Sequence, residues 1–431
     1  MKRAVAEFPI PERFLEGLLY AAMSEETLMV LNSNRSRQLS SDKYANYDLV
    51  AAVGAADEIS GGPSCFENLQ RFLDSHGDWV FGAFTYDLKN QVEDLSSSHE
   101  DHIHAPDYHF FVPRLVLAIP AGKNFLEAHY FPDEEKYTGS FIDRLVPGQP
   151  GEAASFDIQC RFTREEYIEH VEQIMDHIRR GDIYEMNFCI EFFARQAVLD
   201  PVETYLVLND ISPMPFSCYY KSGSRYMLCA SPERFLKKNG SKVISQPIKG
   251  TAPRGNDEIS DRLARETLAT DEKERSENVM IVDLVRNDLS RTAARGSVKV
   301  EELCGVYSFS ALHQMISTVT SEVSHGTTLT DIIRAAFPMG SMTGAPKIRA
   351  MELIEKFEKT KRGLYSGSVG YFTPGGDFDL NVVIRSMLYH SEKKYLSYTA
   401  GSAITAGSDP EREYEECLLK ARAMMKVLQH A

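Results

Sequence analysis

The chain has 431 residues, of which 43% are hydrophobic and 25% charged, and its formal net charge is −15 at pH 7. This composition is that of a globular protein with a large core, long enough for two or three domains or one large one. The acidic balance and the lack of a Lys/Arg block exclude nucleic acid as the expected partner. An anionic small substrate is compatible, because only its pocket must be positive.

The cysteines and apolar stretches indicate a compartment. Seven cysteines are scattered without a Cys-x-x-Cys pair, which is typical of reduced thiols in a cytoplasmic protein. Residues 1–16 lack the apolar segment of a signal peptide, and no apolar run reaches the ~18 residues that a membrane span needs. We therefore expect a cytoplasmic protein with no membrane partner.

The first part of the chain mixes short helical and strand-like pieces. Residues 79–87 are interpreted as a buried strand, and the polar, histidine-rich residues 91–109 as a solvated loop, because their spacing matches no metal site. A Pro/Gly cluster at 147–151 predicts a linker within residues 133–156.

Clear periodicity begins at Thr163. Thr163-x-x-Glu166 is a capping box, apolar residues follow at helical spacing, and Gly181 ends the helix. Residues 184–192 then alternate, which predicts a strand. Its apolar face holds Tyr184, Met186, Phe188, Ile190 and Phe192. Glu185 lies on the other face, which points either into solvent or into a site.

Asn239-Gly240 predicts a β-hairpin. A strict two-residue turn pairs Glu233 with Gln246 and puts Lys249 on the opposite sheet face from Glu233. If both serve one site, the ladder must slip or bulge. Pro247 is the expected place, because proline donates no ladder hydrogen bond.

The rest of the chain mixes helices and strands without a regular βαβ repeat, so we expect an α+β fold rather than a doubly wound sheet. The expected helices are 257–268, 271–289, 330–337 and 347–358, and a last helix follows a cap at Ser408-x-x-Glu411. The expected strands are 312–323, 395–405 and the two that flank a turn at 374–377.

Two pairs of glutamates suggest a metal site. Glu274 and Glu277 are three residues apart on one helix, and Glu413 and Glu416 repeat the spacing on the last helix. Facing carboxylates repel unless a cation lies between them. Mg²⁺ takes oxygen ligands, commonly one or two carboxylates completed by water and substrate. The alternative is two solvated helices whose glutamates pair with arginines.

Lys249 and Glu233 suggest a nucleophile and an acid. An amine becomes nucleophilic when a desolvated or cationic setting lowers its pKa. A glutamate can act as a general acid when burial raises its pKa. The alternative is that both are ordinary surface residues.

Three further features suit a bound carboxylate. Gly344-Ala345-Pro346-Lys347 brings backbone N–H groups to a helix N-terminus, Arg385 offers a bidentate partner, and Gly401-Ser402 offers a backbone nest. A turn and a helix cap explain the glycines as well.

Five motifs, in this order, resemble the chorismate-utilising enzymes: anthranilate synthase component I, aminodeoxychorismate synthase component I, and isochorismate and salicylate synthases. They are Ser-Pro-Glu-Arg-Phe from Ser231, Pro-Ile-Lys-Gly-Thr-x-Pro-Arg-Gly from Pro247, Glu-Asn-x-Met-Ile-Val-Asp-Leu-x-Arg-Asn-Asp from Glu277, Gly-Ser-x-Thr-Gly-Ala-Pro-Lys from Gly340 and Glu-Tyr-x-Glu from Glu413. The resemblance implies a chorismate-binding catalytic region at 155–431 and an anthranilate-synthase-component-I-like region at 1–150. The implied fold is large and mixed, with mostly antiparallel β-sheets packed as a sandwich and helices outside.

The resemblance also implies a reaction. Aminodeoxychorismate synthases have lysine at the position of Lys249, where anthranilate synthases commonly have alanine. Lys249 would attack C2 of chorismate, Glu233 would protonate the departing 4-hydroxyl, and ammonia would add at C4 and expel the lysine. The product is 4-amino-4-deoxychorismate, for 4-aminobenzoate and folate synthesis. Isochorismate and salicylate synthases activate water with a lysine at the position of Glu185, so this glutamate argues against water as the nucleophile.

The binding groups are implied in the same way. Glu277 and Glu416 ligate Mg²⁺, which holds the ring carboxylate, and Glu274 and Glu413 support it through water. The positions that match substrate contacts are Thr251, His313, Thr343, Gly344, Tyr371, Arg385, Gly401, Ser402 and Lys420. Ala403 departs from the family, where a second glycine is frequent.

The resemblance implies a partner, because ammonia in this family comes from a glutamine amidotransferase subunit. The chain has no Gly-x-Cys-x-Gly nucleophile elbow of its own. No lyase segment follows, so another enzyme is expected to release 4-aminobenzoate. The segment at Val30–Ser33 lacks the glutamate that marks tryptophan feedback, so feedback is not expected. Two alternatives stay open: anthranilate synthase component I, and a non-catalytic relative that binds chorismate or tryptophan.

Overall fold

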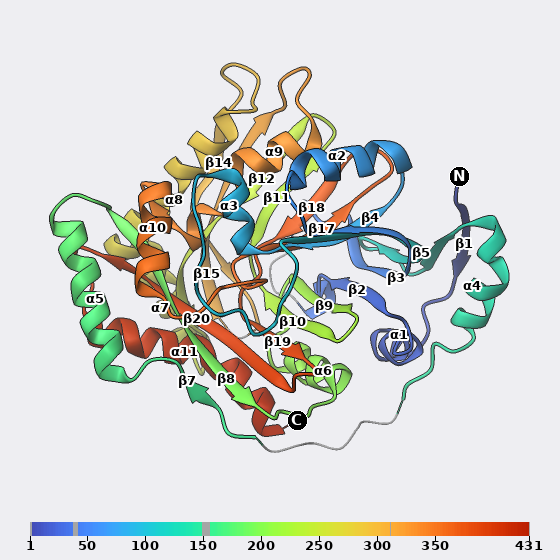
Figure 1. The fold of residues 1–431 in the computed structure, drawn as a ribbon, viewed down its shortest axis with the longest axis horizontal. Helices are drawn as coiled ribbons and strands as arrows, with labels where there is room; N and C mark the ends of the chain where they lie inside the picture. Colours follow the sequence, from blue (N-terminus) through green and yellow to red (C-terminus); the bar gives the residue numbers. More distant parts are fainter. Residues whose placement is uncertain (1, 38–41, 149–155, 311, 431) are drawn as a thin grey trace.

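The structure, a computed structural model, describes residues 2–37, 42–148, 156–310 and 312–430 (Figure 1). The strands are β1 Ala4–Phe8, β2 Thr27–Asn32, β3 Tyr47–Ser60, β4 Val80–Phe84, β5 Tyr108–Pro120, β6 Leu126–Tyr130, β7 Gln159–Cys160, β8 Glu185–Arg195, β9 Phe216–Ser222, β10 Arg225–Ser231, β11 Arg234–Asn239, β12 Lys242–Gln246, β13 Ile248–Pro253, β14 Lys299–Ser308, β15 Leu312–Glu322, β16 Gly344–Ala345, β17 Ser368–Phe372, β18 Phe378–Asn381, β19 Ser386–His390 and β20 Tyr395–Thr405. The helices are α1 Phe14–Ala21, α2 Cys65–His76, α3 Lys89–Val92, α4 Glu135–Ile142, α5 Arg164–Arg179, α6 Pro201–Ile211, α7 Glu258–Thr270, α8 Glu272–Ser290, α9 Leu329–Ala336, α10 Lys347–Phe357 and α11 Pro410–His430.

Two antiparallel sheets grow from the long strands β3 and β5. β5 pairs with β3 along one edge, and along its other edge with β4 and then β6. From β3 the first sheet continues through β2, β9, β10, β19, β20 and β8. From β4 the second sheet continues through β17, β18, β11, β12 and β15, and β15 also pairs with β13 and β14. Strands from before and after residue 150 therefore share both sheets.

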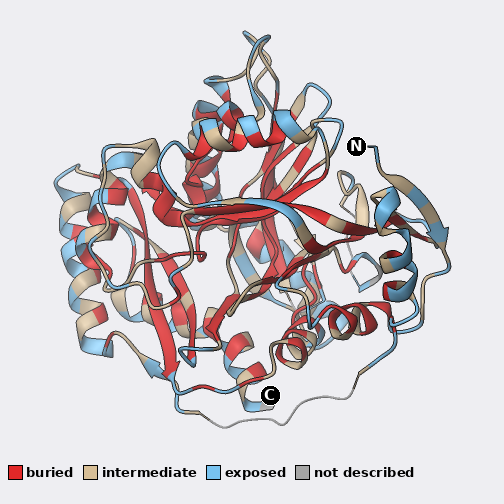
Figure 2. Cartoon of the chain, turned by 45° about the vertical axis from the view of Figure 1, so that its right-hand side comes forward, coloured by how far each residue is buried: buried red, intermediate tan, exposed pale blue. Residues whose placement is uncertain are grey.

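Two apolar cores hold the layers together. One lies between the first sheet and the helices α1, α5, α6, α10 and α11. The other joins the inner faces of both sheets and extends to α2, α8 and α9. Figure 2 shows buried residues along the strands and exposed residues on the outer sides of the helices. The prediction of an α+β fold with antiparallel sheets packed as a sandwich and helices outside is confirmed.

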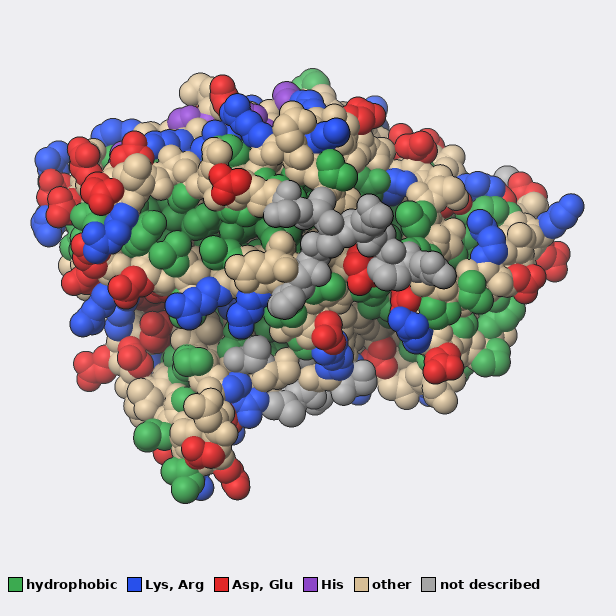
Figure 3. All heavy atoms as spheres, turned by 90° about the horizontal axis from the view of Figure 1, so that it is seen from below, with side chains coloured by type: hydrophobic (Ala, Val, Ile, Leu, Met, Phe, Trp, Pro, Cys, Tyr) green, Lys and Arg blue, Asp and Glu red, His purple; other side chains and the backbone are tan. Residues whose placement is uncertain are grey.

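The surface carries mixed charge. On the face seen in Figure 3, basic side chains are interspersed with acidic ones rather than gathered into one block. Among the described helices, none is both long and apolar enough to cross a membrane.

The two sheets are joined by a double crossing of the chain. Residues 232–233 lead from β10 of the first sheet to β11 of the second, and residues 382–385 lead back from β18 to β19. The N–H of Val382 donates to the carbonyl of Glu233 at 3.0 Å, and the N–H of Ala230 to the carbonyl of Arg385 at 3.1 Å. Glu233 and Arg385 therefore lie side by side at this junction.

The hairpin forms, with a different register from the one expected. Arg234, not Glu233, pairs with Gln246, and the ladder shifts between Arg234 and Lys237. Pro247 separates β12 from β13, and a second shift between Ile248 and Thr251 makes Lys249 part of a bulge against β15. The irregularity expected at Pro247 is thus distributed over both sides of it, and it is what brings Lys249 into a site.

Strand β8 is buried on both faces from Glu185 to Ala194. The expected apolar face was wrong at Tyr184, which precedes the strand and is 66% exposed. A strand between a helical layer and a second sheet needs no solvent face, so its alternation separates two buried surroundings. Glu185 therefore faces the interior.

Some of the other local predictions are confirmed and others are wrong. The capping box at Thr163 is present. The cap at Ser408 was wrong: Asp409 accepts from the N–H groups of Glu411 and Arg412, and Ser408 instead accepts from Thr405. The strand expected at 79–87 is β4, which is shorter, and the expected loop at 91–109 ends inside β5. The linker range contains helix α4, and its Pro/Gly cluster lies mostly outside the described residues.

A buried ion pair closes the outer edge of β8. Glu358 accepts from the N–H of Cys189 at 3.0 Å and pairs with Arg362, which donates to the carbonyl of Asn187 at 2.9 Å. Both charged side chains are at most 5% exposed. These bonds replace a neighbouring strand, so removing either partner leaves unpaired polar groups in the interior.

We predict that Arg362→Ala lowers the free energy of unfolding by about 3–5 kcal/mol, because it leaves the Glu358 carboxylate buried and unpaired. Arg334→Ala is the matched control, since its ion pair with Glu67 is exposed and is expected to contribute less than about 1 kcal/mol. Urea unfolding of the two variants measures the difference. Equal losses would show that the edge of β8 does not depend on this pair.

Candidate active site

The side chain of Lys249 reaches from the bulge of β13 to the first residue of β8. Its Nζ donates to Oε1 of Glu185, which is 1% exposed. Burial alone would lower the pKa of Lys249, but the carboxylates of Glu185 and Glu277 outweigh it and raise the pKa above its ordinary range. The setting is therefore anionic, the opposite of the pKa-lowering setting expected from the sequence, and Lys249 rests as an ammonium.

Glu233 is buried at the crossing between the sheets, with 4% of its surface exposed. Burial raises the pKa of its carboxyl to about 7, although the hydroxyl of Ser341 donates to Oε1 at 2.7 Å and Lys249 and Arg385 favour the charged form. A carboxyl with this pKa is half protonated near neutral pH and can donate a proton. The role of acid proposed from the sequence thus has a suitable environment.

Arg385 lies beside Glu233, and burial lowers the pKa of its guanidinium to about 10. Its backbone is left-handed, with φ of 50°. Within the described chain, its guanidinium has no hydrogen bond or ion pair with another side chain. A half-buried guanidinium whose N–H groups have no side-chain acceptor among the described residues is suited to bind an anion.

The two glutamate pairs lie on facing helices. Glu274 and Glu277 are on α8, Glu413 and Glu416 on α11. Lys273 links the helices, because its Nζ lies 3.4 Å from Glu413 and 3.8 Å from Glu277. Burial raises the pKa of Glu277 to about 7 and also raises that of Glu274. The alternative of two solvated helices is thus wrong for Glu277 and Glu413, which are buried.

These carboxylates suit a hard cation. Oε1 of Glu277 is buried and has no hydrogen-bond partner in the described structure. Across the described residues, no three acidic, histidine or cysteine side chains converge closely enough to hold a metal by themselves. Mg²⁺ commonly takes only one or two carboxylates and completes its shell with water and substrate, so the residues present fit such an ion.

The glycine of the Gly-Ser-x-Thr-Gly motif allows a close approach to Glu185. Gly344 pairs with Met186 in the short strand β16 and has φ of 149°. A Cβ at this position would lie 2.1 Å from the carbonyl oxygen of Glu185. The hydroxyl of Thr343 donates to Met339 within the same turn at 3.1 Å. Gly344 therefore fixes the loop against the start of β8.

Lys420 and Gly401 lie on the α11 side of the site. Nζ of Lys420 donates to the carbonyl of Gly401 at 3.0 Å and pairs with Glu416 at 2.6 Å. The hydroxyl of Ser402 is buried and bonds Tyr167 at 2.9 Å, on the face toward the helices. Only the backbone of Ser402 is thus left for a ligand.

Three further predicted substrate contacts lie in the surroundings described next. Tyr371 packs against Tyr47 and Trp79, and the structure does not bring it to the carboxylate cluster. His313 is fully buried, with its ring nitrogens 3.0 Å from Asp261 and 2.9 Å from Ser308. Thr251 is exposed on β13, two residues beyond Lys249.

Comparisons with known proteins identify the family. The family described as chorismate binding enzyme matches residues 25–426. The chain belongs to the chorismate binding enzymes. It is 37% identical over 386 residues to anthranilate synthase component 1 of Thermus thermophilus, covering 85% of this chain and 82% of that one. It is 35% identical over 350 residues to aminodeoxychorismate synthase component 1 of Escherichia coli, covering 81% and 77%.

Its fold is similar to that of anthranilate synthase component I from Streptococcus pneumoniae. The TM-score is 0.79, with 26% sequence identity over 90% of this chain and 93% of the other. Because relatives with both names match at similar identity, the family is established while the position at which chorismate is substituted must be argued from the site.

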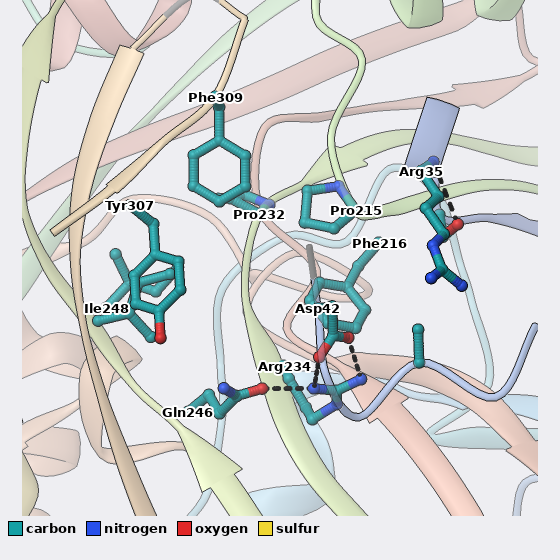
Figure 4. A pocket seen from close by; sticks show the side chains of 13 residues that line it. Arg35, Asp42, Pro215, Phe216, Pro232, Arg234, Gln246, Ile248, Tyr307 and Phe309 are labelled. Atoms are coloured by element: carbon teal, nitrogen blue, oxygen red, sulfur yellow. Dashed lines mark hydrogen bonds and ion pairs between the residues drawn. The ribbon is translucent and has the colours of Figure 1, made fainter. Parts of the chain in front are cut away.

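This chorismate binding enzyme also has a cavity lined by neither Lys249 nor Glu233. Its volume is about 650 Å³, including the open solvent at its mouth. Figure 4 shows Arg234 in its floor, bonded to Asp42 and Gln246, below an apolar wall that includes Phe216 and Phe309. Pro232 and Ile248, which precede Glu233 and Lys249, also line it. The cavity and the site therefore share two chain segments.

Three residues have contacts in the site that the sequence did not predict. The strand face of Glu185 and its departure from relatives were noted, but its hydrogen bond to Lys249 was not expected, because the two positions are 64 residues apart. Lys273 carried a usable signal, because it precedes Glu277 by one helical turn. Ser341 lies in a recognised motif, but nothing in the sequence pairs it with Glu233.

We predict that the free energy of unfolding of Glu233→Gln, measured relative to that of wild type, increases as the pH rises. Burial keeps Glu233 protonated in the folded state up to about pH 7, so unfolding releases a proton between the ordinary and raised pKa values and wild-type stability falls across that interval. The variant lacks this loss of stability, which amounts to about 3 kcal/mol over the whole interval between the ordinary and the raised pKa.

Urea unfolding at pH 5 and pH 8 measures the difference. Glu272→Gln makes the same change at an exposed position of α8 and is the control. A stability difference between Glu233→Gln and wild type that is the same at both pH values would show that Glu233 is not held protonated.

Proposed function

We propose that this chain is the synthase component that aminates chorismate at C4, giving 4-amino-4-deoxychorismate for 4-aminobenzoate synthesis. The observation that carries the proposal is the position of Lys249: a largely buried primary amine, on a bulge of the second sheet, within electrostatic reach of the buried acid Glu233. An enzyme that added ammonia directly at C2 would have no use for an amine there.

The reaction follows from the roles of these two groups. Nζ of Lys249 attacks C2, the ring double bonds shift, and Glu233 gives its proton to the departing 4-hydroxyl, which leaves as water. Ammonia then adds at C4, the electrons return through the ring, and the bond from C2 to Nζ breaks. Glu233 recovers a proton from the new ammonium at C4, so the acid is regenerated.

The charged groups around the ring would bind its two carboxylates. The guanidinium of Arg385 lies beside Glu233 and is suited to bidentate binding of one carboxylate. Glu277 and Glu416 would hold Mg²⁺, with Glu274 and Glu413 behind them. Bound Mg²⁺ would neutralise the second carboxylate of the substrate and the repulsion among the glutamates.

The partner and compartment belong to the proposal as well. Ammonia would come from a glutamine amidotransferase subunit, in line with the designation component 1 of the Escherichia coli relative. All seven cysteines are free, as in proteins of the reducing cytoplasm, where we place the reaction.

Product analysis tests the proposal. The purified chain is incubated with chorismate, Mg²⁺ and excess ammonium, and the products are separated by chromatography with mass and fluorescence detection. A non-fluorescent amino adduct that keeps the enolpyruvyl group supports amination at C4. Fluorescent anthranilate would mean anthranilate synthase, the second candidate, which the Thermus thermophilus relative favours. No consumption of chorismate, even with an amidotransferase present, would favour the non-catalytic alternative.

We predict that Lys249→Ala lowers formation of the 4-amino product by roughly 10³-fold or more, because it removes the nucleophile. Lys249→Arg is the control: it keeps a cation beside Glu185 but offers no nucleophilic amine, and it should be equally inactive. If either variant formed the 4-amino product at the wild-type rate, Lys249 would not be the nucleophile.

We predict that Glu277→Gln raises the Mg²⁺ concentration for half-maximal activity by about tenfold or more, because it removes a charged ligand. Glu272→Gln, on the exposed side of the same helix, should leave the requirement unchanged. Mg²⁺ titrations of both variants measure the effect. An unchanged requirement in Glu277→Gln would remove this residue from the metal site.

A further inference from the structure

The ion pair between Lys249 and Glu185 poses a problem for the proposed reaction. The ammonium of Lys249 has no free electron pair, so it must lose a proton before it can attack carbon. The side chain of Lys249 is only 10% exposed, and among the described carboxylates Glu185 is the only one with which it forms an ion pair. A proton acceptor must therefore be within reach inside the site.

The other charged groups around Lys249 are less suited to this task. Glu274 and Glu277 of α8 and Glu416 of α11 act on it through space only, and Glu416 is paired with Lys420 at 2.6 Å. Glu233 at the sheet crossing accepts from Ser341 and must itself supply a proton. Lys273 of α8 is a cation and lies between Glu277 and Glu413.

Glu185 meets the requirements of an acceptor. Its Oε1 already holds a proton of Lys249, and its Oε2 is buried without a hydrogen-bond partner in the described chain. The strand pairing of β8 with β16 and β20 fixes its backbone on both sides. No reorientation is needed to receive the proton, because donor and acceptor are already in hydrogen-bond contact.

We propose that Glu185 positions Lys249 and takes its proton, and that this carboxylate makes the lysine, rather than water, the group that adds at C2. The inference rests on the proposed amination of chorismate. It also accounts for the departure from the isochorismate and salicylate synthases. Those enzymes have a lysine at the position of Glu185, whereas here the lysine comes from β13 of the other sheet and Glu185 is its hydrogen-bond partner.

The protons balance over one turnover. Lys249 passes a proton to Glu185 and attacks C2 as the neutral amine, while Glu233 protonates the leaving hydroxyl. When ammonia adds at C4, Lys249 leaves C2 as the neutral amine and takes its proton back from Glu185. Glu233 takes one from the amino group at C4. The resting ion pair and the protonated Glu233 are restored, and no oxidant or reductant is used.

The test compares kcat of wild type and Glu185→Gln as a function of pH. The variant keeps the shape of the side chain but accepts no proton, so we expect kcat near pH 7 to fall roughly 10²-fold. In the variant the proton must leave to solvent, so the ratio of variant to wild-type kcat should rise about tenfold per pH unit until Lys249 is deprotonated. The dependence on Glu233 cancels in this ratio.

Two more variants separate proton transfer from a structural role. Glu185→Asp restores a carboxylate and should recover part of kcat and the wild-type pH profile. Glu191→Gln removes another buried carboxylate of β8, which is paired with Arg161 instead of Lys249, and should leave the pH profile unchanged. A Glu185→Gln variant with wild-type kcat and profile, or one equally inactive at every pH and not rescued by aspartate, would overturn the proposal.

A second readout is independent of chorismate. Labelling of Lys249 by trinitrobenzenesulfonate, followed across pH by peptide mass, reports the free amine directly. Because Glu185 holds the proton of Lys249 in place, labelling should begin at least about one pH unit lower in Glu185→Gln than in wild type. An unchanged labelling curve overturns the role of Glu185. A shifted curve in a protein that makes no 4-amino product overturns the proposed function instead.

Discussion

The open edge of strand β8 is the constraint on which the site depends. β20 pairs with this strand along its whole length. Along the other edge, the only described strands that pair with it are the two-residue strands β7 and β16 at its ends. Between them, Glu358 and Arg362 bind the backbone, and the carbonyl of Thr343 accepts from Asn187 at 2.9 Å. Side chains thus complete the hydrogen bonding of a strand buried on both faces, and the same bonds hold the motif loop of residues 340–347 against Glu185.

The charged side chains of the site are positioned by the places where the chain crosses between the sheets. Glu233 and Arg385 are at the double crossing, and Lys249 is on a bulge next to Pro247, where regular pairing stops. Irregular backbone lets acid, cation and amine approach one another without occupying one face of one sheet. Burial then sets their protonation, raising the pKa of Glu233 to about 7 while the carboxylates around Lys249 keep it charged.

The sequence predicts elements better than it predicts their partners. Strand β20 was expected with the limits it has, and the box at Thr163 is present, because periodicity and capping are local. The solvent face of β8 and the register of the hairpin could not be read, since they depend on a second sheet and on a bulge. At the site, resemblance supplied Lys249, Glu233 and the four glutamates. It did not supply the bond of Glu185 to Lys249 or the position of Tyr371, which depend on three-dimensional packing.

The double crossing ties the distances within the site to the alignment of the two sheets. Glu233 and Arg385 connect the sheets covalently, whereas Glu185 belongs to the first sheet and Lys249 to the second. A shear of one sheet against the other would therefore lengthen the contact of Lys249 with Glu185 before it moved Glu233 relative to Arg385. The packing between the sheets thus sets the distance between Lys249 and Glu185. A substitution that changes the side-chain volume in the core between the sheets is expected to change how well the amine is aligned.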